Sequence, residues 1–230
     1  PAPAPPPAPA PAAEAEAEAA AAAEAEAPPR TLAFPPLGVG PNAFDVERAA
    51  ATTMKAVALF LRGNPAPQLR LLLALDDPSS QLAAFEAARA AEPGLASEPR
   101  FTLRAAPLLK LASDAGVRAA AIANPANHRL SAKGGGLNRA VHAAAPALEG
   151  ATRAAFSGGI AAAGRVLAVP LPTDCPLRAT QGVEYVIHAV APNMHPNRPD
   201  CLDGDYDTGC RQLAETYEHL FREFVGTVLH

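Results

Sequence analysis

The chain of 230 residues is poor in several residue types, and each shortage excludes a class of protein. It has no tryptophan, and its three cysteines lack C-x-x-C spacing, so neither a disulfide framework nor a zinc site is indicated. We therefore expect a reducing compartment, the nucleus or the cytoplasm. Nothing in the sequence calls for a metal ion or a cofactor.

Long apolar runs are also missing, because glutamate, arginine or proline interrupts every alanine-rich stretch. A membrane helix needs about 18 consecutive apolar residues, so no membrane partner is expected. Residues 1–29 hold five of the 23 acidic residues and no arginine, the opposite of a transit peptide. The other residues, 19 basic and 18 acidic, carry a net charge of +1, which argues against a non-specific nucleic-acid binder.

Residues 1–29 contain only proline, alanine and glutamate. Such a segment has almost no large apolar side chain to offset the entropy of ordering, so we predict a disordered linker. Because the chain begins with Pro1, we expect a segment of a longer protein with fused neighbouring domains. Residues 30–230 have the length of one α/β domain.

Strand and helix patterns alternate after the linker, which predicts a layered α/β sandwich. The run 69–75 is almost entirely apolar, as in a strand covered on both faces. Asp45 begins a helix with apolar residues at helical spacing up to Gly63. The other predicted strands are 31–34, 101–104, 117–123, 165–171 and 183–190, and the other predicted helices are 77–91, 147–156, 205–224 and one from residue 137.

A Gly-rich loop at residues 124–136 follows a predicted strand and leads directly into a predicted helix. Asparagine side chains at a strand end can hydrogen-bond sugar hydroxyls, and glycines let backbone N–H groups approach an anion. The helix N-terminus also favours negative charge, so the loop predicts a cradle for a diphosphate and a sugar. The predicted ligand contacts from this loop are Asn124, Asn127, Gly134, Gly135, Gly136 and Leu137.

The sequence around this loop resembles the macro domain family. I-A-N-P-A-N at 122–127, the glycine triplet and L-N-R-A-V-H at 137–142 are similar to that family's N-A-A-N strand end followed by G-G-G-V-x-x-A-I-H. V-I-H-A-V-A-P at 186–192 resembles the family's next long strand. The resemblance implies a three-layer α/β/α sandwich with a mixed central sheet. It also implies that Asn127 faces the distal ribose of ADP-ribose while the glycine loop wraps the diphosphate.

The family's second phosphate loop, on a strand that reads I-A-F-P, has its match earlier in the chain. Residues 32–40 read L-A-F-P-P-L-G-V-G, and the helix and strand after them match the family's C-terminal unit. We predict a circularly permuted macro domain, with 30–95 equivalent to the family's C-terminal part and 98–230 to its N-terminal part. The alternative, the end of one macro domain followed by the start of another, would leave unpaired sheet edges. This loop adds the predicted ligand contacts Gly38, Val39, Gly40 and Phe44.

The same arrangement resembles the middle region of plant aprataxin-like multidomain proteins. The similar phrases are V-P-L-P-T-D-C-P-L at 169–177 and A-P-N-M-H-P-N-R-P-D at 191–200. That resemblance implies a kinase-like module before this region, a histidine-triad module and a zinc finger after it, and a context of DNA repair. The six histidines contain no H-x-H-x-H run, so DNA-adenylate hydrolysis is not expected of this chain.

Two positions depart from the macro domain pattern. Pro107 stands where members commonly carry an aspartate that hydrogen-bonds the adenine amine, and Asp114 is a candidate to replace it. Asn138 stands where hydrolytic members of one branch carry an aspartate that can activate water. Because an asparagine cannot act as a base, the candidates for a catalytic group are Asn127 and His142, a residue type that titrates near neutrality.

The sequence thus predicts a module that binds ADP-ribose, free or attached to protein or nucleic acid. One alternative is a hydrolase that removes ADP-ribose or a terminal phosphate from ADP-ribose derivatives, and another is a degenerate, structural module. A dinucleotide-dependent oxidoreductase fits less well. G-V-G-P-N-A at 38–43 places a proline before the helix, and Asp76 lies far beyond the usual spacing for that motif.

Overall fold

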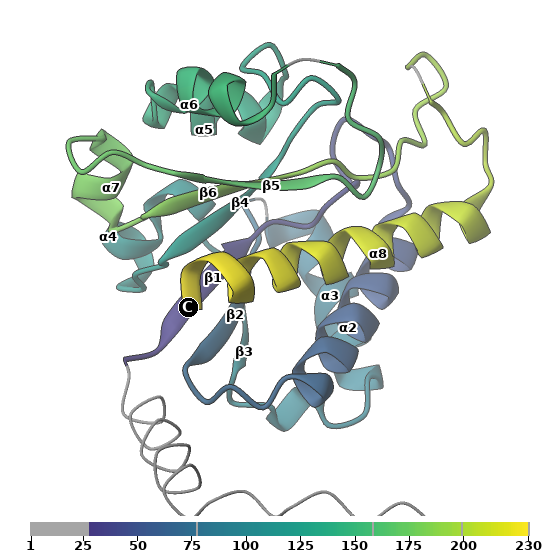
Figure 1. Cartoon of the computed structure of the whole chain (residues 1–230). Coiled ribbons are helices and arrows are strands. Elements are labelled where there is room, and N and C mark those ends of the chain that lie inside the picture. Colours follow the sequence, from purple (N-terminus) through teal and green to yellow (C-terminus); the bar gives the residue numbers. More distant parts are fainter. Residues whose placement is uncertain (1–27, 77, 158, 199, 230) are drawn as a thin grey trace, which may run out of the picture.

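Figure 1 shows the computed structural model, which describes residues 28–76, 78–157, 159–198 and 200–229. The strands are β1 (Arg30–Phe34), β2 (Leu69–Ala74), β3 (Phe101–Arg104), β4 (Ala121–Pro125), β5 (Val166–Pro170) and β6 (Tyr185–Ala189). The α-helices are α2 (Val46–Gly63), α3 (Pro78–Ala91), α4 (Leu111–Ala115), α5 (Gly136–Ala144), α6 (Leu148–Ala155), α7 (Pro176–Gln181) and α8 (Tyr206–Phe224). Shorter segments are the 3₁₀ helices η1 (Leu95–Ser97) and η2 (Leu108–Lys110) and the π-helix η3 (Val225–Leu229).

The six strands form one sheet in the order β3-β2-β1-β4-β6-β5. All neighbouring strands run parallel except β5, which is antiparallel to β6. The strand β1 lies inside the sheet, because Leu32 pairs with Leu71 on one side and with Ala121 on the other. The mixed central sheet predicted from the sequence is confirmed.

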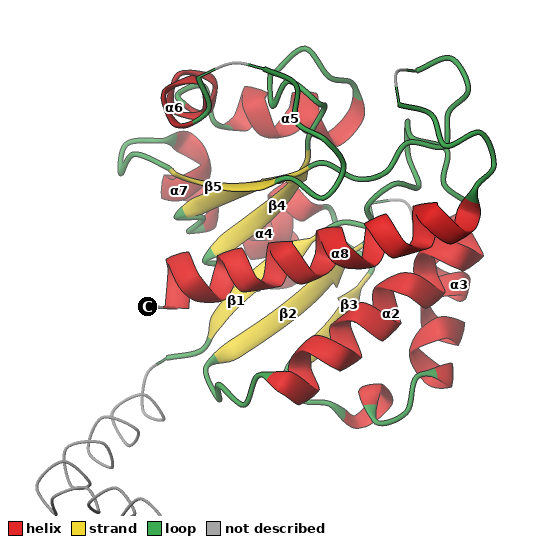
Figure 2. Ribbon diagram, turned by 45° about the vertical axis from the view of Figure 1, so that its right-hand side comes forward, coloured by secondary structure: helices red, strands yellow, loops and turns green. Residues whose placement is uncertain are grey.

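Helices cover both faces of this sheet (Figure 2). Leu32 and Phe34 of β1 point to the face covered by α2, α3 and α8, and both are fully buried. Ala33, between them, points to the opposite face with residues of η2 and α4 to α7. Alternate residues of the strands thus pack into two separate apolar cores, one on each face of the sheet. The predicted three-layer α/β/α sandwich is therefore confirmed.

The two long helices have capping signals that the sequence displays. The Asp45 side chain accepts a hydrogen bond from Arg48 N at 2.9 Å, and that of Asp205 accepts from Thr208 N at 3.0 Å. Such caps satisfy backbone donors that the first helical turn leaves unpaired. The predicted helix 45–63 is observed as α2 and the predicted helix 205–224 as α8.

The largest difference from the sequence-based prediction is the strand expected at 117–123. It begins only at Ala121, because Val117 N bonds back to Leu111 O and Gly116 is left-handed, which closes α4. The helices α4 and α7 are too short to give a periodic signal and were not predicted. The predicted linker falls mostly outside the described residues and stays a prediction. No helix in the described ranges is long and apolar enough to cross a membrane.

Candidate functional site

The loops after β1 and β4 leave the same edge of the sheet, since these strands are parallel neighbours. From β1 the chain passes through α2 to β2, and from β4 it passes through α5 and α6, on the opposite face, to β5 and β6. The two connections therefore diverge between β1 and β4 (Figure 2). In open α/β sheets, ligands bind in the crevice that forms at such a switch point.

The loop after β1 is a tight turn that needs glycine at one position. Gly38 has a φ of +86°, and a Cβ atom there would lie 3.2 Å from the Cβ of Phe44. Phe44 N also donates to Gly38 O at 3.0 Å, while Leu37 N donates to the buried hydroxyl of Tyr217 at 2.8 Å. The base of this loop is thus fixed by the core.

The predicted contact residues of this loop fall into two groups. Gly40 is exposed with open space around it, and Val39 is half-buried, so both are accessible at the strand edge. Phe44 is only 3 % exposed, and its ring packs edge-to-face on Tyr206 with centroids 5.6 Å apart. Phe44 supports the loop from beneath, and its predicted contact with a ligand stays a prediction.

The loop after β4 is organised by asparagine amides. The Asn127 side chain donates to Ser131 O at 2.7 Å and accepts from Arg129 N at 2.9 Å. Asn138 Nδ2 donates to the same Ser131 carbonyl at 2.9 Å. A side chain on Gly134 would overlap the Asn138 amide, so this glycine is required by packing.

The next two glycines have a different environment, which is open. Gly135 is the N-cap of α5 with extended backbone, and Gly136 has a φ of +54°. Apart from the adjoining backbone, no atom of the described residues lies within 4 Å of the position that a Cβ would take at either residue. Among the residues that the structure describes, no side chain caps α5, so its first N–H groups, at Leu137 and its neighbours, are the donors that an anion can use.

A series of buried polar side chains connects this loop with β6 and α6. Asn124 Nδ2 donates to Asn138 Oδ1 at 2.8 Å and lies 2.9 Å from Nδ1 of His188. Nε2 of His188 lies 2.9 Å from the hydroxyl of Thr152 on α6. Since an amide NH₂ can only donate, His188 accepts at Nδ1 and carries its proton at Nε2. Asn124 is fully buried, so its observed role is to fix the loop, and its predicted ligand contact stays a prediction.

Burial, with a smaller contribution from the neighbouring His142, lowers the pKa of His188 to about 3. The rings of His142 and His188 stack with centroids 5.6 Å apart. Burial also lowers the pKa of His142, against the opposing effect of Glu149, whose Oε2 lies 3.6 Å from Nδ1. The His142 side chain is 4 % exposed and has no hydrogen-bond partner among the described residues. His142 lies on the buried face of α5, and its predicted catalytic role stays a prediction.

A carboxylate that the sequence motifs do not assign to this edge lies beside Pro107. Asp76 follows β2, and its Oδ1 accepts a hydrogen bond from Leu108 N at 2.9 Å. Because β2 and β3 are parallel neighbours, their carboxyl ends bring Asp76 and Pro107 together. By contrast, Asp114 lies on α4, in the connection that leads toward the amino end of β4. The position of Asp76 directly after a buried strand is the signal that could have identified it.

Asn42 ties the first loop to the segment after β6. Its side-chain amide donates to Pro192 O at 3.0 Å, and its backbone carbonyl oxygen accepts from Met194 N at 2.9 Å. Arg198 donates to Asn42 Oδ1 at 3.2 Å. The segment after β6 therefore lies against the loop after β1, a neighbour that its sequence alone did not reveal. In the described ranges, no group of three histidine, cysteine or acidic side chains is placed to hold a metal ion.

Comparison with known proteins gives relatives of this fold, although no family model matches the chain. The Arabidopsis thaliana protein "Transcription factor bHLH140" is 38% identical over 199 residues, which are 86% of this chain and 21% of that protein. The chain thus spans about a fifth of that relative's length. A Dictyostelium discoideum ADP-ribose binding macrodomain is 19% identical, with a TM-score of 0.68 over 84% of this chain and 89% of that one, a likeness of fold.

A second solved structure is more similar. The Oryza sativa APL macrodomain in complex with ADP-ribose is 38% identical to this chain and superimposes with a TM-score of 0.77. The match covers 86% of this chain and 96% of the rice domain. At this identity and coverage, the chain belongs to the macrodomain family.

Proposed function

We propose that this chain binds ADP-ribose, free or attached to protein or nucleic acid, in the crevice between the loops after β1 and β4. The observation that carries the proposal is the pairing of β1 with β4, which brings both Gly-rich loops to one edge. The rice relative, of the same family, is described in complex with ADP-ribose. Open glycines and the uncapped N-terminus of α5 supply donors for a diphosphate.

Calorimetric titration of the whole chain tests this proposal. We expect ADP-ribose to bind with a Kd in the micromolar range, about −8 kcal/mol, and AMP and NAD to bind much more weakly. The preference is expected because only ADP-ribose presents both a diphosphate and a free distal ribose. Absence of binding to a folded sample would contradict the proposal and favour the structural alternative.

Asn127→Ala is expected to weaken ADP-ribose binding about tenfold. The substitution removes the amide that holds Ser131 O and Arg129 N, and with it the predicted contact to the distal ribose. The measurement is the same titration, with Asn64→Ala as the control, because Asn64 lies at the end of α2 remote from the loop. Equal affinities for the two variants would argue against a role of Asn127.

Asp76 is proposed as the carboxylate that accepts the adenine amine in place of the family's aspartate. We expect Asp76→Ala to weaken ADP-ribose binding about tenfold or more, since hydrogen bonds to charged groups contribute about 1.5–3 kcal/mol. Asp114→Ala is the matched control, as it removes an exposed carboxylate that lies elsewhere. If both variants bind ADP-ribose alike, Asp76 does not read the adenine.

The circular permutation and the wider context are also proposals. The order of strands supports the permutation, because β1 and β2 fill the sheet between β3 and β4. Fused neighbours, an aprataxin-like arrangement and a DNA-repair context are consistent with the small share of the Arabidopsis relative that the chain covers. A nuclear or cytoplasmic location agrees with three free cysteines. For the hydrolase alternative, two side chains on α5 are not free to act as a base: His142 is buried, and the Asn138 amide donates to Ser131 O.

A further inference from the structure

A cavity lies at the edge of the sheet opposite to the proposed ADP-ribose site. Its volume is about 420 Å³, within the usual range for small-molecule sites. The amino ends of β1, β4 and β6 form its floor, and the turn after α7 forms one wall. A strand of five residues is about 16 Å long, so this cavity is separate from the loops at the carboxyl ends.

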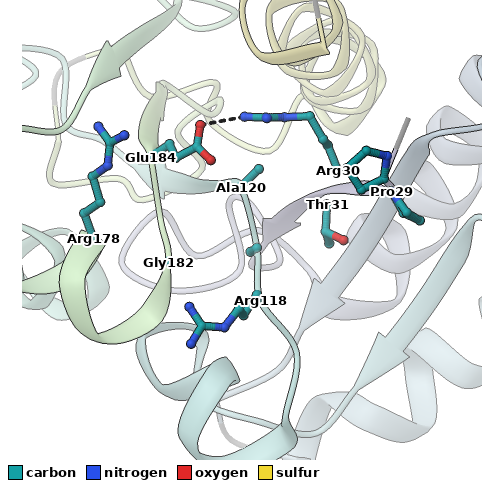
Figure 3. A pocket seen from close by; sticks show the side chains of 10 residues that line it. Pro29, Arg30, Thr31, Arg118, Ala120, Arg178, Gly182 and Glu184 are labelled. Atoms are coloured by element: carbon teal, nitrogen blue, oxygen red, sulfur yellow. Dashed lines mark hydrogen bonds and ion pairs between the residues drawn. The ribbon is translucent and has the colours of Figure 1, made fainter. Parts of the chain in front are cut away.

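Three arginines and one glutamate supply the charged groups around this cavity (Figure 3). Arg30 reaches across to Glu184, and their side chains form an ion pair of 2.6 Å. This pair neutralises itself and orients the Arg30 guanidinium. The charge that remains is that of Arg118 and Arg178, which lie on either side of the turn at Gly182 in Figure 3.

Arg178 and Arg118 are positioned by different means. Arg178 Nη1 donates to Leu171 O at 2.7 Å, which fixes one side of its guanidinium and leaves other N–H groups available. Arg118 is exposed, and no partner for its guanidinium occurs in the described ranges. It lies against the backbone at Gly182, where a Cβ atom would come within 3.1 Å of Arg118 Nη1. The absence of a side chain at Gly182 therefore makes room for the Arg118 guanidinium.

We propose that this cavity is a second anion site, which takes the phosphate or diphosphate group of a small molecule. Two guanidinium groups that have no ion-pair partner in the described part of the chain match a dianion better than a single carboxylate does. Their planar forks can each bind two phosphate oxygens. The near-neutral charge of the remaining chain, 19 basic against 18 acidic residues outside 1–29, favours a small ligand over a nucleic-acid polymer.

The test is a titration of the ¹⁵N-labelled whole chain with inorganic pyrophosphate at constant ionic strength, followed by NMR. We expect saturable shifts of the backbone amides of Arg118, Gly182 and Glu184. Arg118→Gln is expected to weaken this binding about two- to fivefold, the range for exposed ion pairs. Arg118→Glu is expected to weaken it further, since it adds repulsion.

The matched control is Arg211→Gln, which removes an exposed arginine at the other end of the molecule, on α8. It should leave the shifts at Gly182 unchanged. The site-resolved readout also separates this cavity from the proposed ADP-ribose site, because pyrophosphate bound there shifts residues 37–44 and 126–136 instead. Shifts confined to those loops, or an Arg118→Glu variant that binds as the wild type does, would overturn the proposal.

Discussion

Gly135→Val is expected to abolish most ADP-ribose binding while leaving the fold intact. The residue has extended backbone, which valine adopts readily, and a Cβ atom there meets no protein atom within 4 Å. The valine side chain would therefore occupy the space in which the diphosphate approaches the N-terminus of α5. Steric overlap of this kind costs about 1–3 kcal/mol, so we expect the Kd to rise about ten- to a hundredfold.

Two measurements check this expectation: calorimetric titration with ADP-ribose and the thermal unfolding temperature. The contrasting variant is Gly134→Val, whose side chain would overlap the Asn138 amide and disturb the loop itself. It should lower both the affinity and the unfolding temperature, whereas Gly135→Val should lower only the affinity. Wild-type affinity in Gly135→Val would mean that the ligand does not approach this glycine.

Acidification is expected to destabilise the protein through His188. Burial lowers the pKa of this histidine to about 3, against about 6.5 in the unfolded chain. The unfolded state therefore binds more protons than the folded state between these two values. The contribution of neutral His188 to the free energy of unfolding is fully present above about pH 6.5. It is lost as the pH falls toward 3, by about 1.4 kcal/mol per pH unit well inside this window. Native domains have only about 5–15 kcal/mol of stability, so this loss is large.

His188→Gln separates this effect from the titration of carboxylates. The variant loses the ring that accepts from Asn124 and donates to Thr152, so we expect about 1–3 kcal/mol less stability at pH 7. It also loses the proton uptake, so the difference from the wild type should shrink as the pH falls to 4.5. Urea unfolding at several pH values measures this difference. The assignment would be contradicted if the difference in unfolding free energy between His188→Gln and the wild type were the same at all pH values. It would also be contradicted if the control His219→Gln, at an exposed site, showed the same decrease of that difference.

The sequence predicted the layered architecture because its signals are local. The apolar run of β2 and the capping residue Asp45 each specify an element without knowledge of the remaining chain. The pairing of β1 with β4 is not local, and only the resemblance to macro domains indicated it. The two glycine loops were also predicted from the family's motifs, together with the order of strand, loop and helix around them.

The roles of individual side chains at the site were harder to predict. Asn124 looks like a ligand contact by type, yet it is buried, and its NH₂ group interacts with Asn138 and His188 in the core. Phe44 is likewise a core residue. Asp76, by contrast, was not predicted as a site residue. Its neighbour at the carboxyl edge, Leu108, is 32 positions away in the sequence. Such contacts depend on which strands become neighbours, and residue type alone does not determine that.

The central position of β1 has a consequence for synthesis on the ribosome. β1, β2 and β3 emerge first and can pair with one another, but the other edge of β1 stays open until β4 has been translated. An open strand edge is a template for pairing with another chain. The nascent protein is thus most exposed to misassociation while residues 35–120 are leaving the exit tunnel. The pairing of β4 with β1 then closes the open edge of β1, and the same pairing first brings the two glycine loops together.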